Sequence, residues 1–304
     1  MDSYAPAAAF SDGVEADVVV ETPRESQFDD KAFIDPRRQQ FGYRPLKAWH
    51  HFRELLKDKE NTEEVFHIFE SLPWKGVEPA ARAYLASERG RQIRTSEAYL
   101  VPILDDHAAL RLMPAGSVAQ AYCDFMEREG LSAQGLIDEF DKFSANRPKF
   151  DDQLEWYFRR LRDTHDLLHV LTGYGRDALG EACVLAFTYS QQPAPANLFI
   201  SYLAGLNMRK RGTTDAPILR AIREGQRLGK ACPRIAEQSI RELLAMPLDE
   251  ARAKLNITPA KFYHEVHQVW QDNGIDPFDL LTDWFVRSTT SPMAAFLSRQ
   301  RKWS

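Results

Sequence analysis

The chain has 304 residues, of which 44% are hydrophobic and 27% are charged, and its formal net charge at pH 7 is −5. A chain of this length can bury one sizeable hydrophobic core or two small ones, and its acidic balance argues against a general nucleic-acid binder. The sequence has three cysteines, no CxxC pair and no implied disulfide framework, so we expect a reducing compartment. The cysteines are Cys123, Cys183 and Cys232.

The first 40 residues carry many more acidic than basic side chains. The acidic residues include Asp2, Asp12, Glu15, Asp17, Glu21, Glu25, Asp29 and Asp30. A mitochondrial transit peptide is basic and poor in acidic residues, and a secretory signal needs a longer apolar core, so neither is predicted. We therefore expect residues 1–40 to form a disordered acidic arm and the protein to be cytoplasmic, in a bacterial-type setting.

Beyond this arm, apolar residues recur at the spacing of a helix face. The first such group is Trp49, Phe52, Leu55 and Leu56. The pattern predicts an all-α protein with a single compact, multi-helix bundle-like domain over residues 41–260, whose first helix begins near Pro45. Residues 261–304 are predicted to add a helical C-terminal extension and a tail.

One segment contains a pair of histidines separated by one helical turn. Residues i and i+4 of a helix lie on the same face, about 40° apart around the axis. His165 and His169 can therefore direct their rings to a common point, with Asp166 beside them. Gly173 and Gly175 are placed to end this helix, because glycine accepts the left-handed conformation of a tight exit.

A second helix is predicted to begin at Asp177, whose side chain can cap it, and to bring Glu181 back toward the histidines. Two imidazoles with one or two carboxylates are donors that suit zinc or iron. We therefore predict a divalent metal site. Its expected ligands are His165, His169 and Glu181, with Asp166 as a further ligand or as a hydrogen-bond partner of a ligand ring.

Other origins of this pattern stay open. The histidines can be hydrogen-bonded core or surface residues without a metal. The spacing also resembles the HExxH helix of zinc peptidases, although Asp166 stands where those enzymes have their glutamate base. A ferritin-like bundle with two metal ions needs two ExxH repeats, whereas Glu64 and His67 form a single ExxH far upstream. A phosphohydrolase of the HD type would need a separate histidine and a distal aspartate.

No stretch approaches the roughly 18 consecutive apolar residues of a membrane-spanning helix. The nearest candidate, residues 195–206, is followed by the basic residues Arg209, Lys210 and Arg211. Such a helix can pack in the core, with its basic end against the negative end of the helix dipole. It can equally lie against an anionic membrane surface, and both alternatives stay open.

The C-terminal part of the chain gives weaker predictions. Residues 235–246 are expected to form one amphipathic helix. His264 and His267 raise the alternative of a second metal site, but no further ligand lies near them in the sequence, so we expect them to face solvent. Residues 296–304 are basic and aromatic, which suits contact with lipid headgroups as well as a frayed tail.

Three segments together point to a known family. The histidine segment has the pattern HDxxH, eleven residues, Glu; residues 156–162 (WYFRRLR) precede it, and residues 112–122 contain LMPAGSVAQAY. These segments resemble the Coq4-type family of coenzyme Q (ubiquinone) biosynthesis proteins, including its L-P-x-G-S-x-G-x-x-Y segment. One departure is Ala119, which stands where a glycine is usual in that family. The resemblance covers roughly residues 42–260.

The resemblance implies an enzyme that acts on a polyprenylated, benzoate-derived ubiquinone precursor. The implied reaction is oxidative decarboxylation, in which a hydroxyl group replaces the ring carboxylate. The implied catalytic and metal-binding residues are His165, Asp166, His169 and Glu181. Arg159, Arg160 or Arg162 can receive the carboxylate by a bidentate contact, and Tyr174 can hydrogen-bond to the ring.

The resemblance also implies peripheral association with the inner-membrane surface, contacts with other ubiquinone-biosynthesis proteins, and a homodimer. One alternative is a non-catalytic organiser that binds metal and lipid and assembles the ubiquinone-biosynthesis enzymes. Another is a lipid carrier that encloses the prenyl tail. An apolar tunnel leading to the HDxxH segment would favour the enzyme or the carrier, whereas a metal site remote from any tunnel would favour the organiser.

Overall fold

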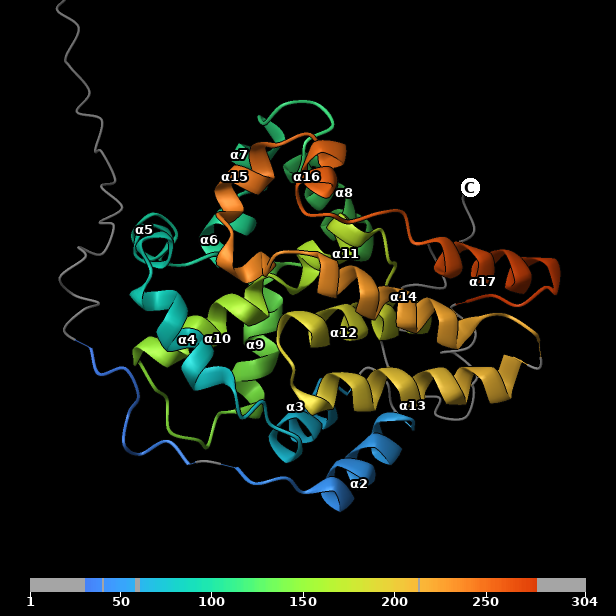
Figure 1. The fold of residues 1–304 in the computed structure, drawn as a ribbon, viewed down its shortest axis with the longest axis horizontal. Helices are drawn as coiled ribbons and strands as arrows, with labels where there is room; N and C mark the ends of the chain where they lie inside the picture. Colours follow the sequence, from blue (N-terminus) through green and yellow to red (C-terminus); the bar gives the residue numbers. More distant parts are fainter. Residues whose placement is uncertain (1–30, 40, 58–60, 213, 278–304) are drawn as a thin grey trace, which may run out of the picture.

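A computed structural model describes residues 31–39, 41–57, 61–212 and 214–277 (Figure 1). These residues form helices and loops, with a β-bridge between Ser117 and Pro247, so the predicted all-α class is confirmed. The first helices are α2 (Pro45–Leu55), α3 (Thr62–Ser71), α4 (Val77–Ala86), α5 (Glu88–Ser96), α6 (Val101–Leu104), α7 (His107–Arg111), α8 (Val118–Glu129) and α9 (Ala133–Phe143). They are followed by α10 (Gln153–Asp163), α11 (His165–Thr172), α12 (Ala178–Gln191), α13 (Pro195–Gly212), α14 (Ile218–Ala231), the 3₁₀ turn η1 (Ile235–Glu237), α15 (Ile240–Ala245), α16 (Leu248–Lys254) and α17 (Lys261–Asp272).

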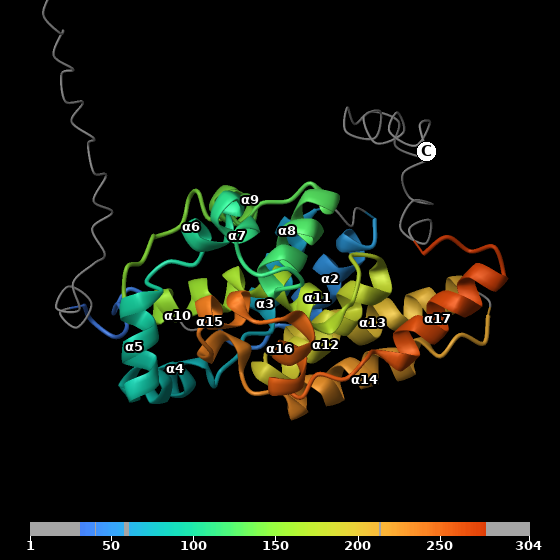
Figure 2. The same ribbon diagram turned by 90° about the horizontal axis from the view of Figure 1, so that it is seen from above.

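Helix α12 lies at the centre of the molecule, between α13 and α14 in both views (Figures 1 and 2). Its Leu179, Val184 and Phe187 side chains are fully buried. A helix with apolar residues on every side is expected in a core rather than at a surface. The main hydrophobic cluster joins α12 to α8, α11, α14 and α17. The three cysteines are buried and unpaired, as the sequence predicts.

Two glycines of α14 allow its backbone to approach α12 closely. Gly225 and Gly229 lie one turn apart and face the carbonyl groups of Cys183 and Phe187. A Cβ atom would lie 2.6 Å from the first carbonyl oxygen at position 225 and 2.2 Å from the second at position 229. The two helices therefore pack backbone to backbone, which fixes the position of α12.

The start of the described chain is held against α10. Residues 31–39 were predicted as part of the disordered arm, but Phe33 and Ile34 pack on the apolar cluster formed by α4, α5 and α10. Arg38 Nε lies 2.6 Å from Asp152 Oδ2. The predicted disorder is therefore wrong for these residues, because a distant ion pair and apolar contacts order them. The remainder of the predicted arm lies outside the described residues.

The contact between Arg38 and Asp152 predicts a pH-dependent contribution to stability. Burial alone would raise the pKa of the Asp152 carboxyl, but hydrogen bonds from Arg38 and from backbone N–H groups hold it below the ordinary value of 3.8. The ionised carboxylate therefore stabilises the fold above pH 3.8, and this contribution is lost as the pH falls through the lower folded-state pKa.

We expect Asp152→Asn to lower the free energy of unfolding by about 1.5–3 kcal/mol at pH 7, the range for hydrogen bonds to charged groups. The difference from wild type should shrink as the pH falls below 3.8. Urea unfolding followed by circular dichroism over a pH series measures it. A difference that stays constant with pH would contradict the assignment.

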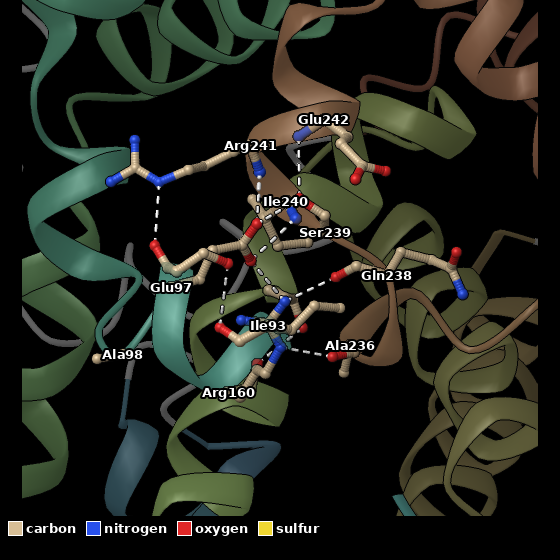
Figure 3. Close-up of polar contacts among 12 residues, drawn as sticks. Ile93, Glu97, Ala98, Arg160, Ala236, Gln238, Ser239, Ile240, Arg241 and Glu242 are labelled. Carbon is tan, nitrogen blue, oxygen red and sulfur yellow. Dashed lines mark hydrogen bonds and ion pairs between the residues drawn. The ribbon is translucent and has the colours of Figure 1, made fainter. Parts of the chain in front are cut away.

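A buried ion pair joins Arg160 of α10 to Glu97, the residue that follows α5 (Figure 3). Arg160 Nη2 lies 2.8 Å from Glu97 Oε2, and the two side chains are 2% and 0% exposed. The same guanidinium donates to the carbonyl oxygens of Ala236 at 2.6 Å and Gln238 at 2.7 Å. Arg160, which the sequence left as a candidate for substrate binding, is therefore committed to the interior of the fold.

Glu97 also caps α15. Its carboxylate accepts hydrogen bonds from the Ser239 hydroxyl at 2.5 Å and from the N–H groups of Ile240 at 3.1 Å and Arg241 at 3.0 Å (Figure 3). The single helix predicted over residues 235–246 is therefore wrong: η1 and α15 are separated by extended backbone at Gln238 and Ser239. The cause is tertiary, because Glu97 and Arg160 bind the backbone groups that a continuous helix would use internally.

Helix α13 contains the apolar stretch for which the sequence left two alternatives. Its Ile200 and Met208 side chains are buried, whereas Leu206 near its basic end is 50% exposed. Packing in the core therefore accounts for much of the helix. Among the described residues, no helix has both the length and the apolar character needed to cross a membrane. Residues 296–304 lie outside the described part of the chain.

Candidate metal centre

Helices α11 and α12 form the hairpin that the sequence predicts. Helix α11 begins at His165 and ends at Thr172, and the next residue, Gly173, has the left-handed φ of 77°. The Asp177 carboxylate then caps α12 by accepting hydrogen bonds from the N–H groups of Leu179 at 3.1 Å and Gly180 at 3.2 Å. The predicted glycine exit of α11 and the predicted Asp177 cap of α12 are confirmed. Together they place the first turn of α12 beside α11.

Three of the four predicted ligands come together. One donor atom each of His165, His169 and Glu181 lies within 4.8 Å of the other two. Glu181 Oε2 is 3.7 Å from His165 Nε2 and 3.5 Å from His169 Nε2. Two donors that each lie ~2.1 Å from a tetrahedral metal ion are about 3.4 Å apart. The spacing therefore fits one divalent ion between the three side chains.

The His169 ring is held in one orientation. Its Nδ1 lies 3.1 Å from the Tyr174 carbonyl oxygen, so Nδ1 carries the proton and donates to that oxygen. Phe125 of α8 stacks on the imidazole, with ring centroids 5.4 Å apart. In the neutral ring, Nε2 is then the nitrogen that carries the lone pair, and it is buried without a hydrogen-bond partner among the described residues. A buried lone pair of this kind is suited to a metal ion.

Charge in the cluster is balanced between Glu181 and His169. Burial disfavours the charged form of both groups, but their mutual attraction is stronger. The pKa of the Glu181 carboxyl is therefore held well below its ordinary value, and the pKa of His169 is raised. Glu181 is thus an anionic donor at neutral pH, as a ligand of a divalent cation must be.

Asp166 and Tyr174 do not occupy the positions that the sequence suggests. Asp166 lines the groove described below, but its carboxylate is not part of the three-residue group. Tyr174 is 1% exposed, and its ring packs edge-on against Tyr263 at 5.2 Å. Its side chain therefore lies in the core rather than near a bound ring, and it is the backbone carbonyl that serves the site.

The arginines near the site differ in their availability. Arg159 and Arg162 both line the groove. Arg159 Nε, however, lies 3.5 Å from Glu155 Oε1, and Arg162 Nη2 lies 2.8 Å from Asp163 Oδ1, so both form ion pairs. Arg176 is a further residue at the site that the sequence does not predict. Its Nε lies 3.7 Å from Glu181 Oε1, and its side chain is 36% exposed. Its place in the loop between α11 and α12 was the available signal.

A large groove opens beside the cluster. Its volume is about 3620 Å³, well above the ~300–1,000 Å³ of an ordinary small-molecule pocket. His165, Glu181 and Arg176 line it, whereas the buried His169 does not. Aromatic and aliphatic side chains from α3, α9, α10, α12 and α13 line much of the rest: Phe66, Phe69, Phe140, Phe143, Phe158, Leu185 and Ile200.

The two histidines of α17 have different environments. His264 is exposed, as predicted. His267 is only 27% exposed, and its Nε2 lies 3.3 Å from Asp177 Oδ1, so the prediction that it faces solvent is wrong. The reason is long-range: α17 packs against the loop that joins α11 and α12. Neither histidine belongs to a metal-binding group among the residues that the structure describes.

Several known proteins similar to this chain are described as ubiquinone biosynthesis proteins. The model of the family described as coenzyme Q (ubiquinone) biosynthesis protein Coq4 matches residues 60–261, which include the whole histidine segment. A mitochondrial ubiquinone biosynthesis protein of Neurospora crassa is 31% identical over 134 residues, 42% of this chain and 35% of that protein. A mitochondrial homologue from Leishmania braziliensis is 25% identical over 194 residues, 60% of this chain and 96% of that protein.

Among solved structures, a Nostoc punctiforme protein assigned to ubiquinone biosynthesis has a TM-score of 0.51 and 18% identity, and the match covers 71% of this chain and 100% of that one. This likeness concerns the fold alone.

The chain spans well under half the length of the first curated relatives, 35% of the Neurospora crassa protein and 43% of a Culex quinquefasciatus homologue. Those relatives are named as mitochondrial and lend no support to the bacterial-type setting expected from the sequence. The family match nevertheless covers more than half of the chain. The chain therefore belongs to the Coq4 family, whose members take part in ubiquinone biosynthesis.

Proposed function

We propose that this protein is a metal-dependent enzyme that replaces the ring carboxylate of a polyprenylated ubiquinone precursor by a hydroxyl group. The observation that carries the proposal is the group formed by His165, His169 and Glu181 at the wall of a long, largely apolar groove. A purely structural zinc site usually contains cysteine and is closed. Here the donors are imidazoles and a carboxylate, and His165 and Glu181 are about one-third exposed.

Zinc or iron bound to this group would supply a Lewis acid for the substrate carboxylate. His165, His169 and Glu181 would hold the ion, and the Tyr174 carbonyl keeps the His169 ring in the orientation that leaves Nε2 free. Arg176 lies beside Glu181 and is partly exposed, so its guanidinium can orient an incoming carboxylate. Asp166 lines the groove next to the group and is available to a polar substituent of the ring.

The groove suits a long apolar chain. Phe66 of α3 and Phe140 and Phe143 of α9 contact one another along it, with Phe66 centroids 5.3 and 5.0 Å from the other two. Burial of a prenyl chain against such side chains contributes roughly 25 cal/mol per Å² of apolar surface. We propose that the tail lies along these rings and that the ring end reaches Glu181.

The proposed reaction breaks the carbon–carbon bond between the ring and its carboxylate and forms a carbon–oxygen bond. The carboxylate leaves as carbon dioxide, and water supplies the hydroxyl oxygen. The ring loses two electrons, which dioxygen, the proposed oxidant, takes up with two protons to form hydrogen peroxide. The role of the protein is to hold the carboxylate at the metal group and to keep the ring within the groove.

A direct test incubates the purified chain, loaded with zinc or with iron, with a prenylated hydroxybenzoate in air and without oxygen. We expect mass spectrometry to show exchange of carboxyl for hydroxyl only in air. His165→Ala and Glu181→Ala should abolish turnover, whereas His264→Ala, at an exposed site, should retain it. Unchanged substrate at full metal occupancy would contradict the enzyme and favour the non-catalytic organiser.

The organiser and the lipid carrier differ from the enzyme in where the metal would lie. His165 and Glu181, two residues of the proposed metal site, line the groove. This supports the enzyme or the carrier, because an organiser does not need its metal site to open into a lipid-binding groove. Membrane association remains part of the proposal, with the exposed Leu206 and the basic end of α13 as the candidate contact. The homodimer and the contacts with other ubiquinone-biosynthesis proteins also remain predictions.

A further inference from the structure

We infer that α17 braces the metal-binding hairpin, with Tyr263 and His267 as positioning residues for the ligands His169 and Glu181. The inference rests on the metal site proposed above and adds residues that lie just beyond the family match, which ends at residue 261. It is carried by a chain of buried contacts from α17 to both ligand-bearing helices.

The Tyr263 hydroxyl joins the two ends of the loop between α11 and α12. It donates a hydrogen bond to Asp177 Oδ2 at 2.5 Å and accepts one from the Gly175 N–H at 3.0 Å. Tyr263 is 6% exposed and Asp177 is 1% exposed, so water does not replace these contacts readily. His267 adds a second contact from α17, with its Nε2 3.3 Å from Asp177 Oδ1.

Asp177, which Tyr263 and His267 contact, positions Glu181. The Asp177 carboxylate caps the first turn of α12, and the Asp177 carbonyl accepts a hydrogen bond from the Glu181 N–H at 3.0 Å. A carboxylate fixed by Tyr263 and His267 therefore fixes the first turn of the helix that carries Glu181. The position of the anionic ligand depends on α17 through Asp177.

Gly175, the other residue that the Tyr263 hydroxyl contacts, lies next to the group that orients His169. Gly175 directly follows Tyr174, whose carbonyl accepts a hydrogen bond from His169 Nδ1–H. The loop has little freedom, because a Cβ atom at Gly175 would lie 2.9 Å from the Tyr263 hydroxyl, and one at Gly180 would lie 1.9 Å from the Gly175 oxygen. The Gly175 N–H and the Tyr174 carbonyl belong to one peptide group, so Tyr263 holds the peptide group whose carbonyl orients His169.

Helix α17 is itself firmly anchored, as a brace must be. Val266 and Trp270 are fully buried in the main core. The buried Glu224 of α14 accepts a hydrogen bond from the Phe262 N–H at 2.8 Å and so caps the first turn of α17. The brace therefore ties the hairpin to α14, which packs backbone to backbone against α12.

Groups that orient metal ligands set metal affinity, and removing one typically weakens binding about 10–100-fold. We expect Tyr263→Phe to weaken zinc binding by about 10-fold or more, because it removes the hydroxyl and keeps the ring. The measurement is a zinc titration of the full chain against a competing chelator, together with urea unfolding of the metal-free protein.

Tyr202→Phe is the matched control. It also removes a hydroxyl that is hydrogen-bonded, to Gln226 of α14 at 3.2 Å, but this hydroxyl does not bond to Gly175 or Asp177. Both variants should lower the stability of the metal-free protein, and only Tyr263→Phe should lower zinc affinity. His267→Gln removes the second contact with Asp177 and should shift the affinity in the same direction, which provides a test even if Tyr263→Phe does not fold.

Zinc affinity equal to wild type in Tyr263→Phe and in His267→Gln would overturn the brace while leaving the metal site intact. A wild-type chain that binds no zinc and no iron would instead overturn the metal site itself. The two failures are therefore distinguishable in one titration series.

Discussion

Arg160→Met is expected to lower the free energy of unfolding by about 3–5 kcal/mol, the cost of leaving one partner of a buried ion pair alone. The change would leave the Glu97 carboxylate charged in an environment where its side chain is fully buried. It would also remove the guanidinium that donates to the carbonyl oxygens of Ala236 and Gln238, and these hydrogen bonds hold η1 in place. Urea unfolding of the metal-free protein at pH 7, followed by far-ultraviolet circular dichroism, measures the loss.

Two further variants separate the ion pair from the loss of a long side chain. Arg159→Met removes the neighbouring arginine, which is 37% exposed, and should cost no more than about 1 kcal/mol. Adding Glu97→Gln to Arg160→Met should restore part of the stability, because the buried charge is gone while an amide oxygen can still accept from the first N–H groups of α15. Equal losses for the Arg159 and Arg160 variants would show that the buried pair contributes little.

His169→Ala should remove the ability of zinc to stabilise the protein. A ligand at 100 times its Kd stabilises the folded state by about 2.7 kcal/mol, so wild type should gain a stabilisation of this order when zinc is present at that excess. The His169 variant should gain almost none, because Nε2 of this buried ring is the donor with no other partner among the residues described. Thermal unfolding with and without zinc measures the difference, and it does not depend on catalytic activity.

The same measurement tests the composition of the ligand set. His264→Ala should keep the full zinc-dependent stabilisation, because His264 is exposed on α17. Asp166→Asn should keep most of it, since the Asp166 carboxylate is not part of the group formed by the other three side chains. A loss in Asp166→Asn as large as in His169→Ala would place Asp166 among the ligands and would contradict the three-residue site.

The parts of this protein that sequence alone determined are those governed by local rules. Helical periodicity placed His165 and His169 on one face, glycine at position 173 ended the helix, and Asp177 capped the next one. These features depend on interactions between residues a few positions apart, which a sequence displays directly. These features also predicted that Glu181 lies near the two histidines, because a short loop between two helices leaves few positions for the second helix.

Tertiary structure decided what those rules cannot reach. The helix predicted over residues 235–246 is broken because Glu97, far away in the sequence, binds its backbone. Arg160 lies in the core rather than in the groove because it pairs with Glu97. Arg176 lies beside Glu181 instead. Residues distant in sequence act here through buried hydrogen bonds and charges, whose partners only the packing of the helices selects.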